Sequence, residues 1–283
     1  MIDVEKLDLA RGARQAKHGR IGFSLQQINA VDDHAEVLYS ECLGRLIEPD
    51  GTIRTSEELL AIPGASGIAP DLDRHLFELA LEWLPSHPSH ALGCKISAAT
   101  LADQRTSAAL YDLLLKHSAV ARRMVLEVTG SLAANAHSAA LLKGARALGY
   151  RIAMEAFGPG HATACSLLST PVDIVKIDGS MALHGAAKLG PVVARASRAA
   201  PVVVIEGIET YAQLEAAKVA GATHLQGFLL SEPTLPPVFS QRFTSFAEGR
   251  DLRRERHSDR RLQRSVVSVQ AQGLCAAHLD LGK

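Results

Sequence analysis

Eight short apolar runs, rich in β-branched residues, follow one another between Ile21 and Phe228, and most are separated by segments in which apolar residues recur at helical spacing. This alternation predicts a mainly parallel sheet whose faces are covered by helices. Eight strand and helix units in about 240 residues favour a closed α/β barrel of the (β/α)8 TIM type, with an open doubly wound sheet as the alternative. The predicted strands are residues 21–28, 37–43, 92–96, 124–128, 151–154, 172–177, 202–205 and 223–228.

Charged residues lie at or near the downstream ends of six of these runs. In a parallel barrel the carboxyl ends of the strands open onto one shared mouth, so we expect these side chains to converge there. Four carboxylates and two ammoniums in one cleft suggest a cation-dependent phosphate site. A single glutamate at a strand end is more often a solvated residue or a salt-bridge partner, so the prediction depends on their joint placement. The six residues are Glu41, Lys95, Glu127, Glu155, Lys176 and Glu206.

The overall charge argues against a general attraction to nucleic acid or to an anionic membrane, because thirty basic residues balance thirty acidic ones. Four cysteines lie far apart without a CxxC pair, which indicates neither a zinc site nor a disulfide framework. No apolar run is long enough to span a bilayer, and the N-terminal segment lacks the apolar core of a secretory signal. We therefore expect a soluble, cytoplasmic protein.

The chain changes character near Phe246, so we expect a barrel over residues 1–245 and a short basic tail over residues 246–283. From Arg250 onward seven arginines and one lysine stand against four acidic residues, a net charge of plus four that leaves minus four for the remainder. The tail lacks apolar periodicity with which to join a core. A solvated helix that fades into a disordered end is expected, and a basic arm for a nucleic acid or a partner is the alternative.

The segments at the strand ends form a recognisable succession. They read ECLGR (41–45), CKIS (94–97), LEVTGS (126–131), EAFGPG (155–160), VDIVKIDGS (172–180), IEGIET (205–210) and LQGFLLSEP (225–233). In this order the motifs resemble the EAL-domain family over about residues 22–235. Members of that family are bacterial (β/α)8 barrels that bind cyclic di-GMP and, when intact, hydrolyse it with two divalent metals to linear pGpG. The resemblance implies the same fold and the same ligand class for this chain.

The resemblance also implies roles for individual residues. Glu41, Glu127 and Glu206 match metal-binding carboxylates, and Glu155 stands where the family has the first of two paired aspartates. Lys176 matches the lysine beside the attacking water, so Lys176 and Glu206 are the predicted catalytic residues. The predicted ligand-binding residues are Leu43, Arg45, Lys95 and Gln226.

Departures from the family pattern point to a degenerate site. Lys95 stands where the family has an asparagine metal ligand, and its positive charge would repel a divalent ion at contact range. Ala156 deletes the second aspartate, and the extra methylene of Glu155 displaces its carboxylate. Gly130 removes an acid that would support the metal loop. The Lys95 ammonium could instead occupy the place of a metal and pair with Glu41 and Glu127.

These departures favour a signalling protein that does not hydrolyse cyclic di-GMP and acts by binding it or a protein partner. In that case no cofactor is expected, and a homodimer is left open. The alternative is an active phosphodiesterase that uses Mg²⁺ or Mn²⁺ and tolerates the substitutions. A third hypothesis is a protein-interaction module that has lost the nucleotide as well. The retained Arg45 and Gln226 argue against this third reading.

Overall fold

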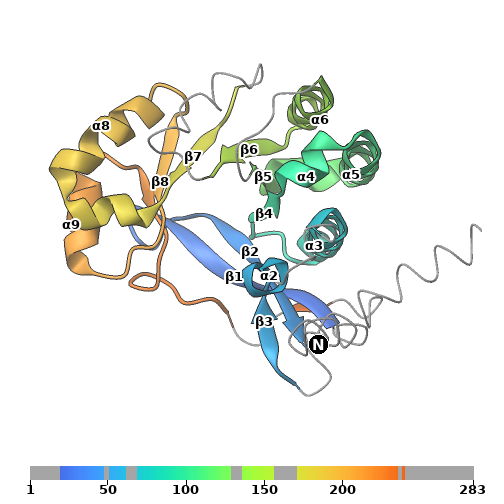
Figure 1. Cartoon of the computed structure of the whole chain (residues 1–283), viewed down its shortest axis with the longest axis horizontal. Coiled ribbons are helices and arrows are strands. Elements are labelled where there is room, and N and C mark those ends of the chain that lie inside the picture. The colour runs from blue at the N-terminus through green and yellow to red at the C-terminus, as the bar shows by residue number, and fades with distance from the viewer. Residues whose placement is uncertain are drawn as a thin grey trace, which may run out of the picture.

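The computed structural model describes residues 20–47, 51–61, 69–128, 136–155, 171–234 and 238–239. Within these ranges eight strands form a closed ring with helices outside it, so the predicted (β/α)8 barrel is confirmed and the open sheet is excluded (Figure 1). Pairings of β1 with both β2 and β9 close the ring. The strands are β1 (Arg20–Ala30), β2 (Val37–Ile47), β4 (Leu92–Ile96), β5 (Met124–Val128), β6 (Arg151–Met154), β7 (Ile174–Ile177), β8 (Val202–Ile205) and β9 (His224–Leu225).

The first strand is the antiparallel exception in a sheet that is otherwise mainly parallel, as the sequence predicts. Strands β2 and β4 to β9 run parallel to one another around the ring, but β1 is antiparallel to both β2 and β9. The connection over residues 31–36 is too short for the crossover of about a dozen residues that a parallel pair requires. The β1–β2 hairpin extends past the barrel, where its ends pair with β3 (Ile53–Thr55) and β10 (Val238–Phe239).

Helices cover the outer surface of the ring, as Figure 1 shows. Their apolar faces pack on the outward residues of the strands in one large buried cluster. None of the helices in the described ranges is long and apolar enough to cross a membrane. The helices are α2 (Ser56–Leu60), α3 (Ala69–Trp83), α4 (Ala98–Ala102), α5 (Gln104–Lys116), α6 (Ala136–Ala147), α8 (Ala186–Ala196) and α9 (Tyr211–Val219), with short 3-10 turns η3 (Leu84–Ser86), η4 (Ser118–Arg123) and η5 (Gly179–His184).

A second, smaller cluster fills the inside of the barrel. Because successive side chains of a strand point to opposite faces, each strand divides its residues between the two cores. In β5, for example, Leu126 packs outward and Val125 packs inward. We call the inward set the interior cluster; its buried members are Ile28, Tyr39, Val125, Ala153, Ile174 and Val204.

Polar contacts fix the segments that leave the strands at the mouth. Asp73 of α3 is buried and accepts hydrogen bonds from the Ser97 amide at 2.8 Å and the Thr100 hydroxyl at 2.5 Å. Ser97 in turn caps the N-terminus of α4, so these bonds position the chain directly after β4. After β8, a capping box between Thr210 and Gln213 starts α9.

Glycine permits a close backbone approach between two of these segments. A Cβ atom at Gly179 would lie 1.9 Å from the carbonyl oxygen of Glu206, so no other residue fits there without a shift of the backbone. The segment after β7 therefore lies directly against the segment after β8. The predicted tail (246–283) and the departures Gly130 and Ala156 lie outside the described residues.

Candidate functional site

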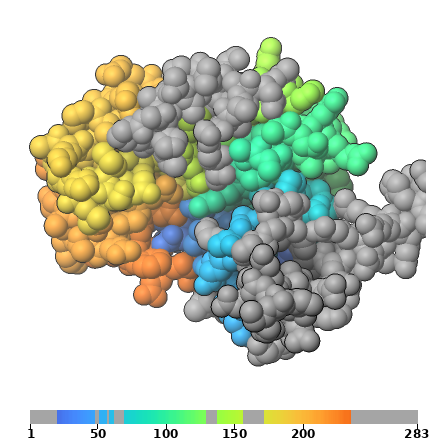
Figure 2. Space-filling view, in the orientation of Figure 1, coloured from blue at the N-terminus to red at the C-terminus, as the bar shows by residue number. Residues whose placement is uncertain are grey.

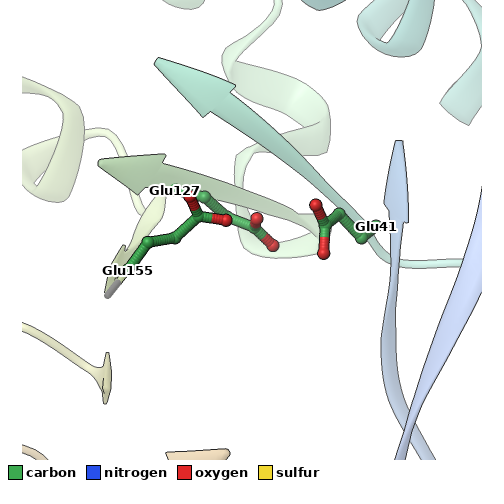
Figure 3. Close-up of side chains that lie close together, drawn as sticks. All are labelled: Glu41, Glu127 and Glu155. Carbon is green, nitrogen blue, oxygen red and sulfur yellow. The ribbon is translucent and has the colours of Figure 1, made fainter. Parts of the chain in front are cut away.

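Strand alternation brings the six predicted charges together. Each charged residue lies two positions downstream of an inward-facing residue on its strand and therefore shares that residue's face, one layer nearer the mouth. The inward residues are Tyr39, Gly93, Val125, Ala153, Ile174 and Val204. We call the layer above them the charged cluster; it comprises Glu41, Lys95, Glu127, Glu155, Lys176 and Glu206. Figure 3 shows three of its carboxylates, from β2, from β5 and from the end of β6, turned toward one another.

Lys176 lies at the centre of the charged cluster. Its side chain is fully buried, and its ammonium contacts all four carboxylates. The Nζ atom lies 2.8 Å from Glu41 Oε2, 3.1 Å from Glu127 Oε2, 3.4 Å from Glu155 Oε1 and 2.8 Å from Glu206 Oε1. A buried ammonium must be paired to be tolerated, and these contacts satisfy that requirement.

Lys95 occupies the outer side of the same cluster. Its Nζ atom lies 3.1 Å from Glu41 Oε1 and 3.3 Å from Glu155 Oε1, and its side chain is 36% exposed. The predicted pairing with Glu41 is therefore confirmed, whereas the other described ion pair of Lys95 is with Glu155 and not with Glu127. The Glu127 carboxylate is fully buried and directs Oε2 to Lys176 instead.

Two glutamines extend the cluster toward β1. The Gln226 amide donates to Glu41 Oε2 at 2.7 Å and to Gln26 Oε1 at 3.1 Å, and Gln26 donates to the Ser231 carbonyl at 3.0 Å. Gln226 was predicted, whereas Gln26 was missed. Gln26 stands opposite Glu41 in the β1–β2 register. The sequence offered only a weak signal for it, since Ser24 and Gln27 are also polar residues of the same run.

An open cavity of about 210 Å³ lies at this mouth. Leu43, Lys95 and Gln226, three of the predicted ligand-binding residues, line it together with Glu41 and Glu206. In Figure 2 the blue residues of the first two strands are visible at the bottom of a recess between the orange and cyan segments.

The fourth predicted ligand-binding residue, Arg45, and the predicted catalytic residue Lys176 are placed differently. Arg45 follows Leu43 by two positions on the same face of β2, but it is not among the described residues that line the cavity. It is partly buried and donates to the Gly44 carbonyl at 3.0 Å. Lys176 has no exposed surface, so in this conformation it acts on a ligand only through the carboxylates around it.

Burial and ion pairing set the pKa values of the cluster in opposite directions. Burial alone would raise the pKa of Glu41, but the ammoniums of Lys176 and Lys95 lower it to about 2. For Glu127, burial and the charge of Glu41 raise the pKa well above its usual range despite Lys176. Burial would lower the pKa of Lys176, but the surrounding carboxylates, Glu127 first, raise it. Both lysines are therefore held in the charged form, because the carboxylates also raise the pKa of Lys95 against the effect of burial.

The cluster contains both the ligands of a metal site and the cations that compete for them. Glu41, Glu127 and Glu155 each offer a carboxylate oxygen, and these oxygens lie within 4.8 Å of one another (Figure 3). Such oxygens suit Mg²⁺ or Mn²⁺. However, the Lys95 ammonium already bridges Glu41 and Glu155. A divalent ion bridging the same two carboxylates does not fit beside this charge, because the two cations would repel at contact range.

Comparison with known proteins gives a consistent family. The model of the EAL domain matches residues 11–233. The signaling protein YkoW of Bacillus subtilis is 28% identical over 214 residues, which cover 71% of this chain and 27% of that protein. The probable cyclic di-GMP phosphodiesterase PdeA of Escherichia coli is 28% identical over 207 residues, covering 69% of this chain and 28% of that protein. The chain thus spans less than a third of the length of these two curated relatives.

Solved structures agree on the architecture. The FimX EAL domain from Pseudomonas aeruginosa, bound to c-di-GMP, aligns with a TM-score of 0.66 at 23% identity and covers 81% of this chain and 96% of that one. At this identity the likeness shows the shared fold. The family match over most of the sequence agrees with the closed barrel and with the charged cluster at its mouth. The chain therefore belongs to the EAL domain family, and its relatives include a probable cyclic di-GMP phosphodiesterase.

Proposed function

We propose that this EAL-domain protein is a signalling protein that binds cyclic di-GMP without hydrolysing it. The observation that carries the proposal is the position of the Lys95 ammonium, 3.1 Å from Glu41 Oε1 and 3.3 Å from Glu155 Oε1. Hydrolysis of a phosphodiester in this family depends on divalent ions that activate water and neutralise the phosphoryl oxygens. A positive side chain among the required carboxylates opposes the binding of those ions. Under this proposal the protein uses no metal cofactor.

Among the described residues, the cavity wall carries one positive side chain beside several carboxylates, and its other groups support binding of a nucleotide. Lys95 supplies a positive charge on the cavity wall, Leu43 an apolar surface and Gln226 an amide, a combination that suits a phosphate attached to an aromatic base. FimX, a relative in fold, has been solved with c-di-GMP. Arg45 is proposed as a further contact, since it stands on the same strand face as Leu43. A protein partner or a second copy of this chain is proposed as the recipient of the signal.

The alternative is an active metal-dependent phosphodiesterase. The three carboxylates within 4.8 Å of one another favour it, and Mg²⁺ or Mn²⁺ would then be held by Glu41, Glu127, Glu155 and Glu206. In that case Lys95 would have to leave Glu41 and Glu155. The similarity to PdeA, a probable cyclic di-GMP phosphodiesterase, also supports this alternative.

Chromatography of the reaction products separates the two readings. Purified protein is incubated with cyclic di-GMP and Mg²⁺ or Mn²⁺, and linear pGpG is quantified. We expect no product above that of the Glu41→Ala variant, which controls for contaminating enzyme. Turnover of about 1 per second or faster in the wild type alone, a rate typical of enzymes, would overturn the proposal.

Calorimetric titration tests the binding itself. We expect cyclic di-GMP to bind the wild type and to bind Arg45→Ala at least tenfold more weakly, because a charge-assisted contact to a phosphate is lost. Arg105→Ala is the matched control, since Arg105 is exposed on α5 outside the barrel. If the wild type gives no heat at roughly 100 μM nucleotide, a limit of about −5.5 kcal/mol, a protein-interaction module remains.

A further inference from the structure

Lys95 and Lys176 hold the same carboxylates from different sides. Lys176 enters from β7, is fully buried and contacts all four glutamates. Lys95 enters from β4, is partly exposed and forms ion pairs with Glu41 and Glu155. The first lysine is thus an internal part of the barrel, whereas the second lies between the carboxylates and the open cavity.

The position of Lys95 is the one that a bridging cation would take. Its ammonium joins Glu41 of β2 to Glu155 at the end of β6, two residues that the ring separates by β4 and β5. Both belong to the group of three whose oxygens lie within 4.8 Å of one another. The bridge therefore crosses the mouth and presents a positive charge to the cavity that Lys95 lines.

We propose that Lys95 is a tethered cation, which takes the bridging place of a divalent ion between Glu41 and Glu155, excludes such ions, and makes ligand binding at this mouth independent of metal. The exclusion follows from the position of this charge between Glu41 and Glu155. The independence from metal rests, in addition, on the proposed function, because it requires that cyclic di-GMP binds here.

The tether has two physical consequences. A lysine ammonium is carried by the chain and is always present, so its occupancy does not depend on the concentration of free cation. Its charge is single and its side chain is partly exposed, so its contact with a phosphate is weakened by salt. Binding at this mouth should therefore be insensitive to chelators and sensitive to ionic strength.

Binding of Mn²⁺ in the absence of nucleotide tests the first part of the proposal, the exclusion of divalent ions. Free Mn²⁺ is measured by its electron paramagnetic resonance signal during titration of wild type, Lys95→Asn and Lys95→Arg. We expect Lys95→Asn to bind Mn²⁺ at least tenfold more tightly than the wild type, because a charge is removed and an oxygen ligand is added. Lys95→Arg should resemble the wild type, since it keeps the charge.

Two further variants test whether the gain in Mn²⁺ affinity arises at the charged cluster. Lys116→Asn makes the same change of charge at an exposed residue at the end of α5, so it should bind Mn²⁺ like the wild type. Adding Glu41→Gln to Lys95→Asn should abolish the gain, since Glu41 would be a ligand. If Lys95→Asn does not fold by circular dichroism, Lys95→Met replaces it, because an unbranched apolar chain also removes the charge. Wild-type affinity within threefold of the Lys95 variant, or an equal gain in Lys116→Asn, overturns the inference.

The nucleotide experiment keeps the two proposals separate. We expect the wild type to bind cyclic di-GMP with the same affinity in EDTA and in Mn²⁺, and Lys95→Asn to bind more weakly in EDTA than in Mn²⁺. A wild type that binds only with Mn²⁺ overturns the tethered cation but leaves nucleotide binding intact. If neither protein binds nucleotide under any condition, the proposed function fails, and the Mn²⁺ titration still decides the exclusion of metal.

Discussion

The interior cluster and the charged cluster are built by the same strands at positions two residues apart, and they depend on different physics. In the interior cluster each side chain contributes by the apolar area that it removes from water, so neighbours are partly interchangeable. In the charged cluster each buried charge costs free energy unless its partner is present. Lys176 shows the difference, because it is as deeply buried as Ile174 two residues earlier and yet has four ionic contacts. Loss of one side chain should therefore cost more at the mouth than in the interior.

The most disruptive change should be Lys176→Met. It leaves four carboxylates around a position that no longer carries a positive charge, and breaking such a buried pair costs about 3–5 kcal/mol. The matched interior change, Ile174→Val, removes one methyl group and should cost about 0.5–1.5 kcal/mol. Urea unfolding measures both. Equal losses would show that the two clusters do not differ in the way described.

The dependence of stability on pH should come from the charged cluster. The pKa of Glu41 in the folded protein is about 2, below its ordinary 4.5, because Lys176 and Lys95 outweigh the effect of burial. A lowered pKa stabilises the folded state fully above about pH 4.5 and loses this contribution as the pH falls toward 2. Between these limits we expect the wild type to lose roughly 2–3 kcal/mol more than Glu41→Gln, as measured by urea unfolding.

Glu127 should act with the opposite sign. Burial and the charge of Glu41 raise its pKa, so the folded state takes up a proton before the unfolded state does. Its contribution therefore becomes more favourable as the pH falls through the raised value. Glu127→Gln should consequently flatten a part of the pH profile that Glu41→Gln does not affect. Identical profiles for the two variants would contradict the assignment.

Gly93 tests the boundary between the two clusters. A Cβ atom there would lie 2.4 Å from the Tyr39 ring and 2.5 Å from Glu127 Oε1, so Gly93→Ala must displace one residue of each cluster. Overpacking of this kind costs about 1–3 kcal/mol. Gly190→Ala is the control, because a Cβ atom at this helical glycine meets nothing within 4 Å. Equal thermal midpoints for Gly93→Ala and the wild type would show that the space is not limiting.

The smallest effect is expected from removal of the tail. We propose that residues 246–283 add nothing to either cluster, because their sequence lacks apolar periodicity. Truncation after Gly249 should leave the thermal midpoint within about 2 °C of the full chain. A larger fall would mean that the tail packs on the barrel.

Much of the fold could be read from local pattern. The predicted run 124–128 coincides with β5, and 202–205 coincides with β8, because short apolar runs bounded by polar segments are decided by neighbouring residues. The run 223–228 was predicted too long: β9 ends at Leu225, and the chain then turns so that Gly227 approaches Ile208. The antiparallel orientation of β1 within the mainly parallel sheet was not predicted, because apolar pattern carries no direction; it follows from the short connection after Ala30.

The sequence by itself determined which residues reach the mouth, because a period of two carries Glu127 above Val125 and Lys176 above Ile174 whatever the rest of the chain does. Only the tertiary structure decided which charge meets which. Lys176 and Glu41 are 135 residues apart in sequence, and closure of the ring brings them to 2.8 Å. The same closure also places Glu127 next to Lys176 and Glu155 next to Lys95. Ion pairing depends on the distance between side chains and on their burial, and no single strand encodes either quantity.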